Sequence, residues 1–360
     1  MILVYTNLRD FQEKVYYWVF FCISFIIHFD QSKTILFPNL EYDLSAIDQN
    51  NFEERALSIF RFQAQHNPTY KNYLQIIGVD PLRINSLLKI PFLPIEFFKT
   101  HKVVTTDFIP EMTFESSGTT MKNTSRHYVR KASLYKDSLE KGFRLFYGEP
   151  RTWCIIGLLP SYLERQNSSL VFMVNELMAI ASHKQSGFYL KDFEKLASEL
   201  SVLERNKQKT LLIGVTYALL DFAEQYPMRL EHTRIMETGG MKGRRQEITR
   251  EAVHEFLKNC FRVPGIDSEY GMSEILSQAY AVNDGIFRCP PWMKVFLRDE
   301  DDPLSTSIGN TGFINIIDLA NFYSCSFIAT DDLGKQVQGG FQVLGRSDLS
   351  DMRGCNLLVV

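Results

Sequence analysis

Apolar residues recur at helical spacing along much of the chain. This spacing from Phe52 to Phe62 predicts a helix over Phe52–Gln65, which ends at Asn67-Pro68. The same pattern predicts further helices over five segments, namely Tyr70–Ile77, Ala132–Phe146, Leu170–Ala181, Phe193–Leu203 and Glu251–Cys260.

Short apolar runs alternate with these helices. Trp153–Leu159 and Leu211–Val215 are apolar on both faces, which is typical of buried parallel strands. A helix follows the second run up to Tyr226, and Arg234–Met236 leads into the turn Thr238-Gly239-Gly240. This alternation of strands and helices predicts an α/β fold in one large domain.

Beyond Asp267 the pattern changes to short strands and turns. Strands are predicted over Thr311–Leu319, Phe327–Thr330 and Gln342–Leu344, and Asp331-Asp332-Leu333-Gly334 is predicted to be a turn. Upstream, Leu87–Lys99 contains Pro91 and Pro94, which exclude an uninterrupted helix. An extended apolar segment is therefore predicted there.

The composition is that of a globular protein. The 360 residues are 45% hydrophobic and 22% charged, and the formal net charge of −3 gives no basic field that would favour nucleic acid. The six cysteines form no C-x-x-C pair and match no zinc pattern, which predicts reduced thiols in the cytoplasm. The 28 phenylalanines fit an apolar pocket, although a phenylalanine-rich core explains them better.

An apolar run, Val15–Phe29, lies near the N-terminus. Its fifteen residues are fewer than the roughly 20 that a helix needs to span a bilayer. Three interpretations stay open: a short membrane anchor, a buried helix, or an extension from an upstream start that adds nothing to the fold. Membrane contact is expected only in the first case.

The segment from Thr113 to Ser125 is rich in hydroxyl groups. Seven of its thirteen residues are Ser or Thr, Gly118 lies among four of them, and Lys122 adds a positive charge. Hydroxyls, a glycine and free backbone N–H groups are the donors that a phosphate requires. The segment is not a Walker A loop, and a plain surface loop is the alternative.

A second motif is Glu269-Tyr270-Gly271-Met272-Ser273-Glu274. A nucleophile elbow would require glycine where Ile275 stands, so a serine hydrolase is not indicated. A carboxylate such as Glu274 is suited to holding Mg²⁺ on a nucleotide's phosphates, and Tyr270 offers a flat face for a base. A helix N-terminus capped by Ser273 is the alternative.

Two weaker signals concern a nucleoside. In Thr330–Gly334, a carboxylate at the end of a strand is suited to accept the hydroxyls of a ribose, and Arg346 follows shortly after. The turn Glu237-Thr238-Gly239-Gly240 is a place where backbone can approach an adenine closely. It is not the dinucleotide pattern G-x-G-x-x-G.

In their order along the chain, these motifs resemble the AMP-forming adenylate synthetases. Within that superfamily the chain is most similar to the acyl-protein synthetases of LuxE type, over roughly Leu87–Leu358. The closer similarity lies in Pro91-Phe92-Leu93-Pro94-Ile95-Glu96-Phe97-Phe98-Lys99, in the Ser-Ser-Gly-Thr-Thr loop and in Arg353-Gly354-Cys355.

The resemblance implies a fold and a domain division. The fold is the large N-terminal domain of these synthetases, with stacked sheets and helices and a small β-rich subdomain. The mobile C-terminal lid, which carries a catalytic lysine in most relatives, is expected to be absent. Residues 1–40 are then an apolar extension, residues 41–345 the adenylate-forming domain, and residues 346–360 a short tail that carries Cys355.

The resemblance also implies a reaction. Such enzymes use ATP and Mg²⁺ to convert a fatty or other carboxylic acid into acyl-AMP, and the acyl group then moves to a cysteine and on to a reductase or carrier protein. The implied roles are Ser116, Ser117, Gly118, Thr119, Thr120 and Lys122 for phosphates, Gly239, Gly240 and Tyr270 for adenine, Glu274 for Mg²⁺, Asp332 for ribose, Arg346 for ribose or phosphate, and Cys355 for the acyl group. Without a lid, the cation that assists adenylation would be Lys122, Lys99 or Lys242.

Two other functions stay open. One is an acyl- or aryl-CoA ligase of the phenylacetate-CoA ligase type, in which coenzyme A accepts the acyl group and Cys355 is idle. The other is a non-catalytic nucleotide-binding subunit. The sequence specifies neither the acyl chain nor the final acceptor.

Overall fold

In the computed structural model of the protein, the described residues are 43–116, 124–159, 167–190, 192–239, 248–299, 304 and 310–346. The chain divides into two units, Met1–Ala46 and Ile47–Val360. Of the first unit only residues 43–46 are described, and they contain the short 3-10 helix η1 (Leu44–Ala46). All further elements belong to the second unit.

The helices predicted from apolar spacing are confirmed. Asn67 illustrates the local cause, since its side chain accepts a hydrogen bond from Tyr70 N and Pro68 occupies the first turn, so one helix ends and the next begins there. The observed helices are α2 (Phe52–His66), α3 (Pro68–Ile76), α5 (Ala132–Tyr147), α6 (Ser169–Ala181), α7 (Phe193–Arg205), α8 (Thr216–Gln225) and α9 (Arg250–Phe261).

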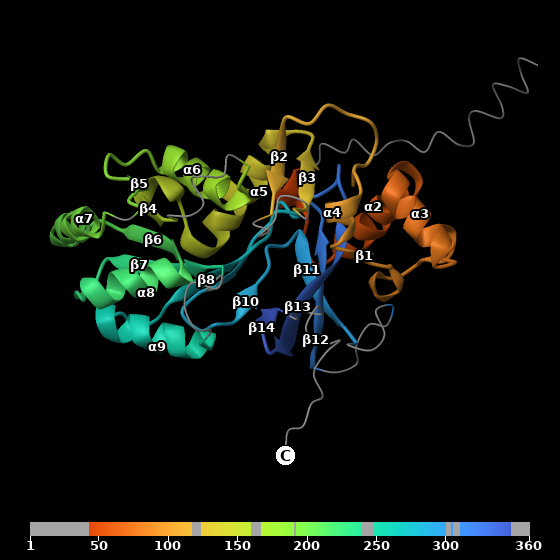
Figure 1. The fold of residues 1–360 in the computed structure, drawn as a ribbon. Coiled ribbons are helices and arrows are strands. Elements are labelled where there is room, and N and C mark those ends of the chain that lie inside the picture. Colours follow the sequence, from red (N-terminus) through yellow and green to blue (C-terminus); the bar gives the residue numbers. More distant parts are fainter. Residues whose placement is uncertain are drawn as a thin grey trace, which may run out of the picture. The chain divides into compact units, whose positions relative to one another are not determined.

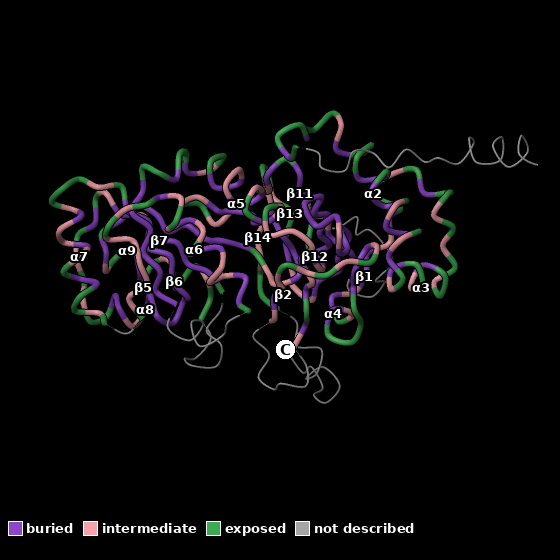
Figure 2. The backbone as a smooth tube through the Cα atoms, turned by 90° about the horizontal axis from the view of Figure 1, so that it is seen from above, coloured by how far each residue is buried: buried purple, intermediate pink, exposed green. Residues whose placement is uncertain are grey.

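The middle of the chain forms the parallel part of a large sheet. Its strands lie in the order β5-β4-β6-β7-β8. Helices α5 and α6 cover one face of these strands, and α8 and α9 cover the other (Figure 1). Every residue of β4, β6 and β8 is buried, and Figure 2 shows this burial at β6. Burial on both faces explains the apolar sequences of β4 and β6, whereas β8 buries the polar side chains of Asp267, Ser268 and Glu269. The bounds are Cys154–Leu158, Gly187–Phe188, Thr210–Val215, Thr233–Thr238 and Asp267–Tyr270 for β4, β5, β6, β7 and β8.

The sheet continues beyond β8 with antiparallel strands. The order from β8 onward is β9, β10, β14, β13, β12 and β11, so a parallel half and an antiparallel half share one sheet. Their bounds are Ala279–Ala281, Phe287–Arg288, Met293–Arg298, Thr311–Asp318, Phe327–Val337 and Gly340–Arg346 for β9, β10, β11, β12, β13 and β14.

The turn predicted at Asp331–Gly334 is wrong. These residues lie inside β13, which runs to Val337 and pairs with β12 on one side and β14 on the other. Hydrogen bonding on both edges outweighs the turn preference of the aspartates, and irregular register near Leu333 absorbs the local mismatch. The chain reverses instead after Val337, where Gly339 has a φ of 83°.

The segment Leu87–Lys99 is extended only at its centre. There β1 (Leu93–Pro94) pairs in parallel with β13. Before and after it lie the 3-10 helix η3 (Leu87–Lys89) and the short helix α4 (Phe97–Thr100). Two further 3-10 helices are η2 (Pro81–Arg83) and η4 (Pro150–Thr152).

A hairpin that the sequence pattern did not predict frames the hydroxyl-rich segment. Strands β2 (Met112–Glu115) and β3 (Arg126–Val129) pair antiparallel as a separate sheet of two strands. The residues between them are therefore held at both ends by a paired strand.

Within the described ranges, no helix combines the length and the apolar character needed to cross a bilayer. The run Val15–Phe29 lies outside those ranges, so its three interpretations remain open.

Candidate functional site

The carboxyl ends of the parallel strands lie at one edge of the sheet, where ligands of open α/β sheets bind. Gly239 directly follows β7, and Tyr270 is the last residue of β8. Gly239 is exposed and has a φ of 69°, a conformation that glycine adopts without strain. The turn and the motif singled out in the sequence therefore begin at neighbouring strand ends.

The two ends of the hydroxyl-rich segment are joined to each other by backbone pairing. Beyond the last ladder pair, Glu115 and Arg126, Ser116 N donates to Ser125 O at 3.1 Å, and Ser125 N donates to Ser116 Oγ at 3.0 Å. The candidate residues Ser117, Gly118, Thr119, Thr120 and Lys122 lie outside the described residues, as do Gly240, Lys242 and Cys355.

Glu274 meets the end of this segment. The hydroxyl of Ser125 donates a hydrogen bond to Glu274 Oε1, and both side chains are buried. Burial raises the pKa of Glu274, whereas the Ser125 hydrogen bond and the positive charges of Arg346 and Lys99 act in the opposite direction. The predicted magnesium ligand thus lies beside Ser125, the last residue of the hydroxyl-rich segment, with Arg346 and Lys99 within electrostatic reach.

A buried histidine supports the turn that carries Glu274. His127 Nδ1 lies 2.8 Å from the carbonyl oxygen of Ser273, and its Nε2 lies 2.9 Å from Asn321 Oδ1. Asn321 Nδ2 donates to the carbonyl of Glu274 at 2.8 Å. Burial lowers the pKa of His127 to about 4, against the effect of both contacts. The neutral ring has one N–H, so it donates to only one of these two oxygens at a time.

This turn does not start a helix. After β8, residues 271–278 have no helical assignment in the structure. The alternative of a helix N-terminus capped by Ser273 is therefore wrong, because the backbone of this turn bonds to His127 and Asn321 and not within a helix.

Tyr270, Asp332 and Arg346 lie together in the structure. The Tyr270 hydroxyl donates to Asp332 Oδ2 at 2.7 Å, and Arg346 is the register partner of Asp332 across β13 and β14. Burial raises the pKa of Asp332, while Tyr270 and Arg346 oppose that rise. Arg346 is 58% exposed and lies 3.7 Å from Asp331 Oδ2, which makes it a cation that a ligand can reach.

The aromatic face expected at Tyr270 is largely covered. Tyr270 is only 8% exposed, and its ring meets the rings of Phe287 and Phe341 edge to face, at interplanar angles of 62° and 79°. The role of Tyr270 in bordering adenine stays a prediction, and its hydroxyl is the group that the structure ties to the site.

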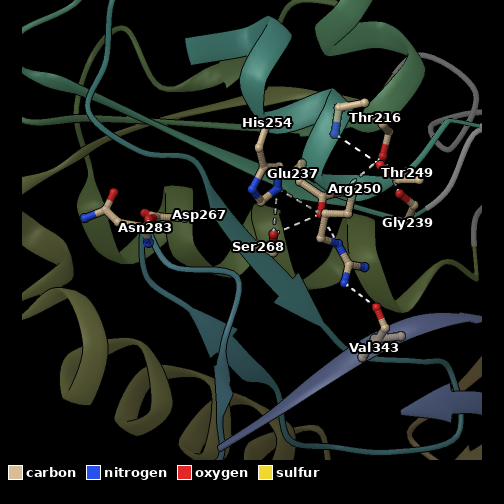
Figure 3. A network of polar contacts seen from close by, with 11 residues as sticks. Thr216, Glu237, Gly239, Thr249, Arg250, His254, Asp267, Ser268, Asn283 and Val343 are labelled. Atoms are coloured by element: carbon tan, nitrogen blue, oxygen red, sulfur yellow. Dashed lines mark hydrogen bonds and ion pairs between the residues drawn. The ribbon is translucent and has the colours of Figure 1, made fainter. Parts of the chain in front are cut away.

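A polar network surrounds the Gly239 turn (Figure 3). Glu237 Oε1 accepts hydrogen bonds from Arg250 Nε and Ser268 Oγ, each at 2.9 Å. Thr216 Oγ1 lies 3.1 Å from Glu237 Oε2 and 2.5 Å from the carbonyl oxygen of Gly239. Burial opposes the ionisation of Glu237, but its contacts with His254, Arg250 and Ser268 outweigh this and lower its pKa.

The described ranges contain no group of three or more His, Cys, Asp or Glu side chains arranged to hold a metal ion. Mg²⁺ bound to a nucleotide often takes one or two carboxylates and completes its shell with phosphates and water. A single oxygen ligand such as Glu274 fits that mode of binding.

Several residues of the site carry no signal in the sequence. His127 and Asn321 belong to a strand and a turn whose neighbours only the tertiary fold defines. Arg250 directly precedes the predicted helix Glu251–Cys260, where a basic residue is unremarkable. The adjacent carboxylates Asp331 and Asp332 were visible, but the pairing of Asp331 with Arg346 follows from the β13–β14 register.

Comparisons with known proteins place these features in context. A model of the protein family described as acyl-protein synthetase, LuxE, matches residues 27–360. No curated protein matched the sequence. Among solved structures, ATP-bound MatB from Rhodopseudomonas palustris has a TM-score of 0.51 at 15% identity, over 65% of this chain and 47% of MatB. A 2-hydroxyisobutyryl-CoA ligase in complex with 2-HIB-AMP and CoA has a TM-score of 0.59 at 13% identity, over 82% of this chain and 74% of that chain.

At these identities the structural likeness concerns the fold. The α/β fold of the large domain of AMP-forming ligases, expected from the resemblance, is confirmed. The chain spans about half the length of MatB. Within the described residues, which end at Arg346, no lid domain follows the sheet.

Proposed function

The chain belongs to the acyl-protein synthetase family of LuxE type, and on that premise we propose that it activates a carboxylic acid with ATP. The products are an acyl-adenylate and pyrophosphate. The observation that supports this most is the hydrogen bond from Ser125, at the end of the hydroxyl-rich segment, to Glu274. It joins a phosphate-binding type of loop to a carboxylate suited to magnesium, although 149 positions separate the two residues.

The charges around Glu274 suit this chemistry. A carboxylate is a poor electrophile, and its conversion to a mixed anhydride with AMP develops negative charge on phosphate oxygens. The donors of residues 116–125 and the exposed guanidinium of Arg346 are the groups that would stabilise this charge. Mg²⁺, when bound, would neutralise further phosphate charge. The ionised carboxylate of Glu274 would hold the Mg²⁺ ion.

Lys99 is our candidate for the cation that assists adenylation. Its positive charge acts on Glu274. Its side chain is 35% exposed, and its ion pair with Glu96 is long at 3.9 Å, so it can turn toward a phosphate. We expect Lys99→Ala to lower kcat for pyrophosphate exchange about a hundredfold. Lys102→Ala is the control, and equal loss in both variants would contradict the assignment.

The finer part of the proposal concerns the acyl acceptor. The acid is a fatty acid, and Cys355 accepts its acyl group before a reductase or carrier protein in the cytoplasm takes it. Burial raises the pKa of all four described cysteines, Cys154, Cys260, Cys289 and Cys325, so each is mainly a thiol at neutral pH. Arg353, two residues before Cys355, would favour the reactive thiolate there.

The experiment is carboxylate-dependent pyrophosphate exchange with a panel of fatty and aryl acids, with and without coenzyme A. Wild type should exchange with a fatty acid and label itself with radioactive acyl groups. Cys355→Ser should keep the exchange and lose the stable label. Equal labelling of both proteins would exclude Cys355 as the acceptor, and AMP release that requires coenzyme A would indicate a CoA ligase. ATP binding without exchange for any acid would indicate a binding subunit.

A further inference from the structure

Arg250 connects the two halves of the large sheet. Its Nε donates to Glu237 Oε1 at 2.9 Å, and its Nη1 donates to the carbonyl oxygen of Val343 at 2.9 Å. Glu237 lies near the carboxyl end of β7 in the parallel half, whereas Val343 lies in β14 of the antiparallel half. One guanidinium, at the first residue of α9, therefore bonds to both (Figure 3).

Each half leads directly to a residue assigned above to the nucleotide. Glu237 precedes Gly239 by two residues, and Thr216 Oγ1 lies within hydrogen-bond distance of both the Glu237 carboxylate and the Gly239 carbonyl. Val343 precedes Arg346 by three residues, and Arg346 lies opposite Asp332. A shift of the Arg250 guanidinium would therefore displace the Gly239 turn on one side and the end of β14 on the other.

The surroundings of Arg250 hold its guanidinium in one orientation. The Phe287 ring lies 5.1 Å from its Cζ, and the Glu237 carboxylate that it pairs with is only 6% exposed. A buried carboxylate requires hydrogen-bonded partners, so Glu237 retains Arg250 strongly. Because a guanidinium is planar, two of its N–H groups fix both a distance and a direction, which a lysine ammonium does not.

We propose that Arg250 is a positioning residue that sets the spacing between the Gly239 turn and the Arg346 end of β14. Through that spacing it sets the affinity for the nucleotide and leaves the affinity for the organic acid unchanged. The inference rests on the proposed function, since that function assigns Gly239 and Arg346 to ATP.

The test begins with Arg250→Gln in the pyrophosphate-exchange assay. We expect KM for ATP to rise about tenfold, the loss typical of hydrogen bonds to a charged group, while KM for the carboxylic acid changes less than about twofold. Arg250→Lys keeps a positive charge beside Glu237 but lacks the second N–H group, which donates to the Val343 carbonyl. It should restore most of the thermal stability, but KM for ATP should remain raised.

Arg234→Gln is the matched control. Arg234 Nε and Nη2 donate to Asp267 at 2.7 and 2.6 Å, so this variant also breaks an arginine–carboxylate pair of β7, but at the amino end of the strand. It should lower stability and leave KM for ATP unchanged. If both variants raise KM for ATP equally, Arg250 acts only through general stability and the inference is overturned.

A double-mutant cycle tests the route through β14. If Arg250 acts by placing Arg346, the change in KM for ATP in Arg250→Gln/Arg346→Gln should be at least about threefold smaller than the product of the single changes. Effects that simply multiply would overturn the inference.

Calorimetry of Mg-ATP binding separates this inference from the proposed function. A wild type that binds ATP without exchange would refute the proposed reaction, and the Kd values of the variants would still test Arg250. A wild type that exchanges normally, with unchanged ATP affinity in Arg250→Gln, would refute the inference alone.

Discussion

At the scale of single residues, two buried carboxylates on neighbouring strands differ in their ionisation. Glu237 on β7 is bonded to Arg250 and Ser268, and its pKa is lowered although burial opposes this. For Glu269 on β8, burial raises the pKa to about 7, against the hydrogen bond that Thr238 Oγ1 donates to its Oε2 at 2.6 Å. The ionised neighbour Glu237 adds to the rise. The pKa values of the two carboxylates therefore differ because of their side-chain partners and not because of burial alone.

The raised pKa of Glu269 makes stability depend on pH. The folded protein binds this proton more tightly than the unfolded chain, whose value is 4.5, so the contribution is complete below pH 4.5 and is lost as the pH rises through about 7. Across that window it amounts to about 3 kcal/mol. Glu269→Gln imitates the protonated form. Its free energy of unfolding should therefore equal that of wild type near pH 4 and exceed it by about this amount near pH 8.

Denaturant unfolding of both proteins at several pH values checks this prediction. A difference between variant and wild type that stays constant from pH 4 to pH 8 would contradict it. The comparison of two proteins cancels the other groups that titrate in the same range.

At the scale of elements, the β2–β3 hairpin decides where the hydroxyl-rich segment lies. Its register brings Ser116 and Ser125 together, and Ser125 then reaches Glu274. The contact between Ser125 and Glu274 therefore depends on the pairing of β2 with β3.

Removal of the Ser125 hydroxyl should weaken magnesium binding. In Ser125→Ala, Glu274 loses the hydrogen bond that favours its ionised form, so its pKa rises further and less carboxylate is available. We expect the Mg²⁺ concentration for half-maximal pyrophosphate exchange to rise about fivefold to tenfold. Ser125→Thr retains a hydroxyl and serves as the control. The same Mg²⁺ dependence in Ser125→Ala and wild type would argue against Glu274 as the metal ligand.

Elements with a strong local signal could be predicted from the sequence, and those fixed by tertiary pairing could not. Helices such as α5 and buried strands such as β4 and β6 carry their periodicity within one segment. The hairpin β2–β3 and the continuation of β13 through Asp331–Gly334 depend on partners distant in sequence, and their polar residues suggested loops.

The same division holds for the site. Motif order and residue type led to Tyr270, Glu274, Asp332 and Arg346, which the structure brings together. The supporting contacts of Glu274 come from β3 and from the residues after β12, and no local pattern marks them. Sequence reasoning found the groups with chemical character and missed those that hold them in place.

At the scale of the molecule, the candidate site lies where the parallel and antiparallel halves of one sheet meet. Gly239 and Tyr270 belong to the parallel half, and Asp332 and Arg346 belong to the antiparallel half. A nucleotide that contacts both halves would stabilise the fold as a whole, because only the folded chain presents both sets of residues.

Mg-ATP should therefore raise the unfolding temperature. At a ligand concentration of a hundred times Kd the gain is about 2.7 kcal/mol, which corresponds to about 5 °C for a domain of this size. Scanning calorimetry with ATP, with Mg²⁺ alone and with GTP measures the shift and its specificity. No shift with Mg-ATP at saturating concentration would contradict a nucleotide site between the two halves.

The position of Arg346 at the end of β14 limits the distance from β14 that Cys355 can reach. Nine positions separate Arg346 from Cys355, and a chain of that length spans at most about 30 Å. A thiol on so short a tether has a local concentration in the millimolar range around the site. Small thiols in solution would have to approach that concentration to compete, so under the proposed function the transfer of an acyl group to Cys355 would have the advantage over transfer to a freely diffusing acceptor.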